Sequence, residues 1–158
     1  MSVMVDSLSE PELRACCAAP AWAGELVAHQ PYQDLETLCR MSDAVLGALP
    51  WPDVLAALSA HPRIGERATG DGREASWSRD EQSAATADER RAAELRAGNA
   101  EYERHFGHVF LICATGLSAD DVLAALRRRL TNDPVTERGV VRDELRKIVR
   151  LRLARLVG

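Results

Sequence analysis

The sequence predicts an all-α fold, a single-domain bundle of seven to eight helices over residues 1–158. Only 4% of the residues are aromatic, whereas alanine, leucine and arginine are abundant. Those three residues are good helix formers, while strands prefer β-branched and aromatic residues. Helix-start signals also precede several segments in which apolar residues recur near the helical period. A chain of this length is sufficient for one domain with a sizeable core.

Four helices are expected in the first sixty residues. Ser9 and Glu12 have the spacing of a capping box, and Pro11 suits the first turn of the helix that they start. Pro62 cannot continue the fourth helix, so His61 is expected just past its C-terminus. The expected ranges are residues 9–18, 21–29, 34–49 and 51–60.

The second half is expected to contain a loop and three further helices. Residues 65–77 carry three glycines and no apolar period, which indicates a loop. Ser78 and Glu81 form an S-x-x-E pattern that predicts the start of a long helix to about residue 105. The apolar run over residues 109–114 fits a buried strand-like segment and a helix start equally well. The last two helices are expected over residues 120–130 and from Pro134 onward.

Charge and composition narrow the classes of partner. The net charge of −4 argues against nucleic acid or an anionic membrane surface as the partner. No apolar run approaches transmembrane length, the first residues do not have the pattern of a signal peptide, and no Ser-Lys-Leu tail is present. Arginines gather from Arg127 to Arg129 and from Arg138 to Arg155, with acidic residues between them, which is typical of a solvated helix face. We expect a cytoplasmic protein without a membrane segment.

Cofactor and metal motifs are absent from the sequence. The four cysteines lack the spacing of a zinc site and are expected to be reduced thiols. There is no Gly-rich phosphate loop, no G-x-S-x-G elbow and no H-E-x-x-H pair. If the protein is an enzyme, we expect it to use side chains alone, with no metal and no cofactor.

His61 and Glu81 are the candidate catalytic pair. Histidine changes charge near physiological pH, and a carboxylate can orient it and stabilise its charge. If the chain folds His61 over the helix that carries Glu81, the two would form one acid–base site. The alternative is structural: His61 caps the helix before it, and Ser78 with Glu81 forms a plain capping box.

Taken in order, the motifs resemble those of the OHCU decarboxylases, the 2-oxo-4-hydroxy-4-carboxy-5-ureidoimidazoline decarboxylases of urate degradation. The matching residues are His61-Pro62-x-Ile64-Gly65, Ser78-x-x-Glu81-Gln82, Asn99-x-x-Tyr102-x-x-x-Phe106-Gly107-x-x-Phe110, Arg129-Leu130-x-Asn132 and Ile148-x-x-x-Arg152-Leu153. Each piece is short, but their order and spacing together are specific to that family.

The resemblance implies a fold, a site and an assembly. It implies an all-helical bundle that forms a homodimer, with His61 as the proton donor and Glu81 as its partner. It also implies that a small-molecule substrate is contacted by a larger set of residues, namely Pro62, Ser78, Arg79, Asp80, Gln82, Phe110, Leu111, Ile112, Cys113, Ala114 and Arg152.

The reaction implied by the resemblance is a cofactor-independent decarboxylation that yields (S)-allantoin and CO2. The substrate has a carboxylate and a hydroxyl on one ring carbon next to a ring C=N, and that imine accepts the electron pair left by CO2. His61 would deliver a proton to one face of the resulting enamine, and Glu81 would favour the protonated imidazole. Three alternatives are a helical interaction module, an acid–base enzyme acting on a related ureido ring, and a nucleic-acid binder using the arginine clusters.

Overall fold

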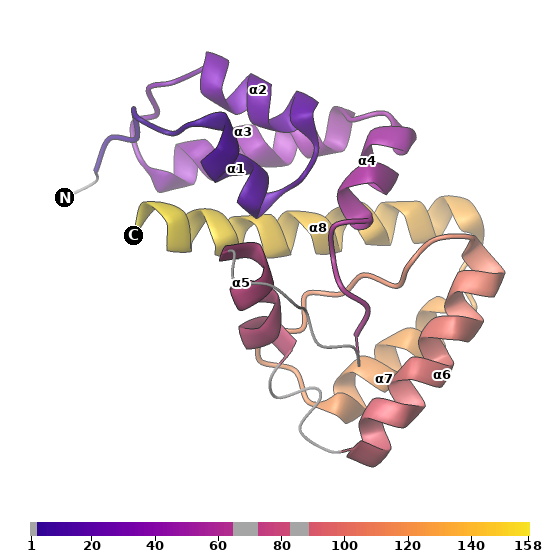
Figure 1. Cartoon of the computed structure of the whole chain (residues 1–158). Coiled ribbons are helices and arrows are strands. Elements are labelled where there is room, and N and C mark those ends of the chain that lie inside the picture. The colour runs from indigo at the N-terminus through magenta and orange to yellow at the C-terminus, as the bar shows by residue number, and fades with distance from the viewer. Residues whose placement is uncertain (1–2, 65–72, 83–88) are drawn as a thin grey trace. The chain divides into compact units, whose positions relative to one another are not determined.

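The computed structural model describes residues 3–64, 73–82 and 89–158 (Figure 1). Over these residues the chain forms eight α-helices and no strand, apart from one isolated antiparallel bridge between Val5 and Tyr32. The expected all-α class is confirmed. The chain divides into two compact units, residues 1–60 with 145–158, and residues 61–144. No helix of the described residues is long and apolar enough to cross a membrane.

The first unit contains four complete helices and the C-terminal part of a fifth. They are α1 (Glu10–Cys16), α2 (Pro20–Ala28), α3 (Leu35–Ala48), α4 (Trp51–Leu58) and the residues from Leu145 onward of α8 (Pro134–Val157). Helix α2 packs against both α1 and α3. The predicted capping box of Ser9 and Glu12 is present at α1, and at α3 the Asp34 carboxylate accepts the Thr37 N–H.

The core of this unit is built around Trp22 of α2, which is fully buried. Its indole N–H donates to the Ser42 hydroxyl of α3 over 3.0 Å, so the one polar atom of the ring has a partner. Helix α8 contributes Ile148, Val149, Arg152 and Leu153 to the buried residues, whereas Leu151 is 40% exposed. The charged Arg152 therefore lies on the buried face of α8, and its apolar neighbour Leu151 does not.

The second unit contains α5 (Arg73–Gln82), α6 (Glu89–Phe106), α7 (Ala119–Arg129) and the start of α8. Helices α6 and α7 pack along each other, and the side chain of Leu126 lies where a Cβ on Gly98 would be. Ser118 and Asp121 form the capping box of α7. Residues 107–118 connect α6 to α7 without regular secondary structure.

The structure corrects two expectations in this unit. Residues 73–77, expected in a loop, are the first half of α5, and residues 65–72 of that expected loop lie outside the described residues. The long helix expected over residues 78–105 is instead two helices, α5 and α6, and residues 83–88 are not described. Helix α5 is mostly polar and lacks an apolar stripe, so periodicity could not reveal it.

Candidate functional site

His61 lies three residues beyond the end of α4. The last turn of α4 is closed by the N–H groups of Ser59 and Ala60, which donate to Leu55 and Ala57. Pro62 follows and has no N–H to continue the helix. His61 is 9% exposed, so the imidazole lies mostly inside the protein rather than in solvent.

Helix α6 holds the segment that follows His61. The side-chain amide of Asn99 donates to the carbonyl of Ile64, and Arg63 forms an ion pair with Glu103 over 2.5 Å. Ile64 is 5% exposed and belongs to the hydrophobic core cluster of this unit. These contacts fix the backbone on the C-terminal side of His61 and so restrict where its ring can lie.

Helix α5 carries four of the predicted site residues with described side chains. Ser78 is 2% exposed, Glu81 and Arg79 are half-buried, and Asp80 is exposed. Ser78 and Glu81 are three residues apart and therefore share one face of the helix. The expected capping box is wrong, because both residues lie within the second half of α5 rather than at its start. Gln82 is the last residue of α5, and its side chain lies outside the described part of the structure.

The segment from Phe110 to Ala114 is neither a helix nor a strand, which settles the ambiguity of the apolar run. Phe110, Leu111, Ile112 and Ala114 are buried, and Cys113 is half-buried. Phe110, Ile112 and Ala114 belong to the same core cluster as Ile64. One hydrophobic core therefore carries both this segment and the segment that follows His61.

Two buried charged residues bind the backbone of this segment. Arg129 of α7 donates from Nη1 to the Leu111 carbonyl over 2.7 Å. Glu144 of α8 accepts the Cys113 N–H over 3.1 Å. Each bond satisfies one end of a peptide group next to Ile112, and in a trans peptide the other end points the opposite way. The N–H and C=O of Ile112 therefore point away from Arg129 and Glu144, and they have no hydrogen-bond partner among the described residues.

A buried polar network lies behind the segment, and sequence reasoning missed it. Glu137 of α8 is fully buried and accepts hydrogen bonds from Arg129, from Asn132 over 3.1 Å and from the hydroxyl of Tyr102. Arg129 was expected on a solvated face with its neighbours, yet it is 6% exposed. Asn132 and Tyr102 were noted only as parts of a pattern. No local signal in the sequence marks these residues, because each of them stands next to other polar or charged residues.

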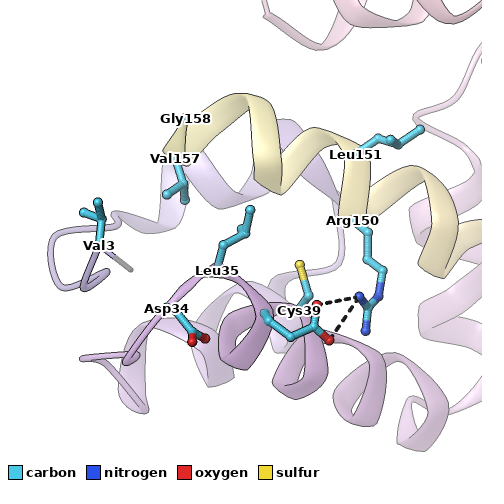
Figure 2. A pocket seen from close by; sticks show the side chains of 9 residues that line it. Val3, Asp34, Leu35, Cys39, Arg150, Leu151, Val157 and Gly158 are labelled. Carbon is cyan, nitrogen blue, oxygen red and sulfur yellow. Dashed lines mark hydrogen bonds and ion pairs between the residues drawn. The ribbon is translucent and has the colours of Figure 1, made fainter. Parts of the chain in front are cut away.

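Arg152 belongs to the other unit. It is 1% exposed on α8 and donates from Nη1 to the carbonyl of Cys16 over 3.4 Å. That unit also has a groove of about 740 Å³ beside α3 and the end of α8, lined by Leu35, Cys39, Leu151 and Val157 among others (Figure 2). At its edge Arg150 pairs with Glu36 over 3.3 Å. None of the described residues that line the groove is a predicted site residue.

Known proteins are similar to this chain over most of its length. Residues 6–154 match the family model described as OHCU decarboxylase. The "Uric acid degradation bifunctional protein TTL" of Arabidopsis thaliana is 31% identical over 97% of this chain, which spans 48% of that relative. The 2-oxo-4-hydroxy-4-carboxy-5-ureidoimidazoline decarboxylase of Amia calva is 30% identical over 89% of this chain and 79% of the relative.

A solved structure has the same fold. It is described as the crystal structure of OHCU decarboxylase in the presence of (S)-allantoin, and it is 29% identical to this chain. The superposition has a TM-score of 0.80 and covers 94% of this chain and 98% of that one.

Proposed function

The chain belongs to the OHCU decarboxylase family, and from this membership we propose that it converts 2-oxo-4-hydroxy-4-carboxy-5-ureidoimidazoline to (S)-allantoin and CO2. The observation that carries the proposal is the likeness to the decarboxylase solved in the presence of (S)-allantoin, which extends over nearly the whole of both chains. The family match includes residues of both compact units, which supports our prediction that residues 1–158 act as one domain.

The proposed reaction replaces a carboxylate with a proton. The bond from the ring carbon to the carboxylate breaks, CO2 leaves, and the electron pair passes into the ring toward the neighbouring C=N. One proton is then delivered to one face of the resulting enamine. The protein must orient the carboxylate out of the ring plane and choose the face that receives the proton.

His61 is the proposed proton donor, and Glu81 is its proposed partner. His61 is mostly buried, and the segment after it is held by Asn99 and Glu103, so the ring is restrained. A carboxylate next to an imidazole favours the protonated, donating form. Glu81 shares a helix face with the buried Ser78, which supports a site-facing role for both side chains.

The proposed binding residues supply hydrogen bonds to the ring and to the ureido arm. A ureido group offers N–H donors and a C=O acceptor, and the backbone of Ile112 offers one group of each kind. We assign the same binding role to Phe110–Ala114 as a segment. The proposed set also includes Pro62 after α4 and four residues of α5, namely Ser78, Arg79, Asp80 and Gln82.

Three further predictions come from the resemblance. Arg152 is the proposed basic residue near the substrate, the assembly is proposed to be a homodimer, and the location is proposed to be the cytoplasm.

The experiment that tests the activity is circular dichroism of a freshly generated urate-oxidation mixture that contains hydroxyisourate hydrolase. With this protein added, we expect the signal of (S)-allantoin to appear rapidly. A signal that only decays at the spontaneous rate to racemic product would contradict the proposal. It would instead favour an enzyme for a related ureido ring or a binding module.

Variants of His61 and Glu81 test the assigned roles. We expect His61→Asn and Glu81→Gln to lose about 10²- to 10⁴-fold in rate, the range that general acid–base groups supply. The matched controls are His29→Asn at the C-cap of α2 and Glu101→Gln on α6, both at exposed positions. Near-normal stereoselective turnover by His61→Asn would refute the proton-donor role.

A further inference from the structure

We propose that the buried pair Arg129 and Glu137 acts as a positioning device that sets the backbone geometry of the binding segment Phe110–Ala114. The proposal rests on the function proposed above, because it assigns these residues to the same site. Neither residue is among the predicted substrate contacts. Their role is to hold the main chain that contacts the ligand.

The guanidinium of Arg129 makes two kinds of contact with the segment. Nη1 donates to the Leu111 carbonyl over 2.7 Å. Cζ of the guanidinium lies over the ring of Phe110, 4.5 Å from the ring centroid. One side chain therefore holds two successive residues of the segment, one through the backbone and one through the ring.

Glu137 fixes the orientation of that guanidinium. Nε and Nη2 of Arg129 both donate to Glu137 Oε2, over 2.9 and 2.6 Å. Asn132 and Tyr102 also donate to the carboxylate, so it is held from α6 and from the turn before α8 as well as from α7. Because the guanidinium is planar, the two bonds to Glu137 also fix the position of Nη1, which donates to the Leu111 carbonyl.

Stability alone does not account for this arrangement. A buried ion pair incurs a large desolvation cost, and an apolar pair of similar volume often stabilises a core at least as well. An apolar pair could not hold the Leu111 carbonyl. Glu144 holds the next peptide through the Cys113 N–H. With both flanking peptides held by buried charges, the N–H and C=O of Ile112 take a defined direction.

The test is Arg129→Lys, which keeps the charge but cannot pair with Glu137 and reach the Leu111 carbonyl in one planar fork. We expect KM for the proposed substrate to rise about tenfold, the loss of one hydrogen bond from a charged donor, while kcat changes much less. A merely structural role would lower the folded fraction and hence apparent kcat, with KM unchanged. The matched control is Arg128→Lys, at the exposed neighbouring position of α7.

A second readout does not depend on activity. Hydrogen exchange of the Cys113 amide reports the segment directly, and the Leu26 amide of α2 reports the other unit. We expect Arg129→Lys to accelerate exchange at Cys113 about tenfold with little change at Leu26. Should the wild-type protein make no (S)-allantoin, the proposed function fails while this measurement still decides the positioning role.

Two results would overturn the proposal: KM and kcat of Arg129→Lys within twofold of the Arg128→Lys control, or equal acceleration of exchange at Cys113 and Leu26. If Arg129→Lys does not fold, Asn132→Ala replaces it, because this half-buried residue provides only one of the donors to Glu137. We expect it to raise KM and Cys113 exchange about threefold, and no change in either would overturn the proposal.

Discussion

Replacing Tyr102 with phenylalanine tests how much its hydrogen bond to the buried carboxylate of Glu137 contributes to the free energy of unfolding. Tyr102 is fully buried, and its hydroxyl donates to Glu137. Phenylalanine keeps the ring and its contacts with Phe106 and Phe110, whose centroids lie 4.6 and 5.2 Å away. The substitution therefore removes one hydrogen bond to a charged group without creating a sizeable cavity. We expect the free energy of unfolding to fall by about 1.5–3 kcal/mol.

The chain offers a matched control in its other tyrosine. Tyr32 is also buried, and its hydroxyl donates to a neutral acceptor, the Leu26 carbonyl, over 2.7 Å. Tyr32→Phe should lower the free energy of unfolding by about 0.5–1.5 kcal/mol, because bonds between neutral groups are weaker. Urea unfolding measures both values. A loss for Tyr102→Phe that is no larger than the loss for Tyr32→Phe would refute the reasoning.

Tyr102→Phe also changes how the free energy of unfolding falls at high pH. Burial, and then the hydrogen bond to Glu137, raise the pKa of Tyr102 above its ordinary value. The folded protein thus keeps this proton at a pH where the unfolded chain loses it. The stabilisation by the protonated Tyr102 hydroxyl is complete below about pH 10 and is lost as the pH rises further. Tyr102→Phe should reduce the alkaline decline by up to about 1.4 kcal/mol per pH unit, and an unchanged slope would contradict this assignment.

Two further predictions concern helix packing and capping. Gly98→Ala should lower the melting temperature, because the added methyl group meets the buried side chain of Leu126. Gly139→Ala, on an exposed face of α8, should instead stabilise the protein by about 0.5–1 kcal/mol. Equal effects of the two substitutions in thermal unfolding would refute the packing argument. At α3, hydrogen bonds from Thr37 lower the pKa of Asp34 in the folded protein. The ionised carboxylate therefore stabilises the fold above the ordinary carboxyl pKa, and this stabilisation is lost as the pH falls through the lowered pKa. Asp34→Asn should therefore show a smaller fall in melting temperature on acidification, and an identical acid profile would count against the cap.

Local signals predicted much of the helical framework. The predicted capping box at Ser9 lies at the start of α1, and the helices expected from residues 34 and 120 begin where Asp34 and Ser118 cap α3 and α7. These predictions succeed because a cap is a contact between a side chain and a backbone N–H only two or three residues away. Nothing distant is needed to form it.

The same pattern failed at Ser78. Residues three apart share a helix face anywhere along a helix, so S-x-x-E does not by itself mark a start. Ser78 and Glu81 lie in the second half of α5. Both residues keep their proposed role in the site, but neither of them caps a helix.

The sequence by itself determined the all-α class, most helix bounds and the family, because these depend on local propensity, local caps and the order of motifs. Only the tertiary structure decided that Arg129 is buried while Arg127 and Arg128 are exposed. Successive side chains on a helix point in different directions, and sequence alone does not say which direction meets a core. The partners of Arg129 are Glu137, eight residues on, and the Leu111 carbonyl, in a segment without a helical or strand pattern. No period links such residues, so their meeting depends on how α6, α7, α8 and the irregular segment pack.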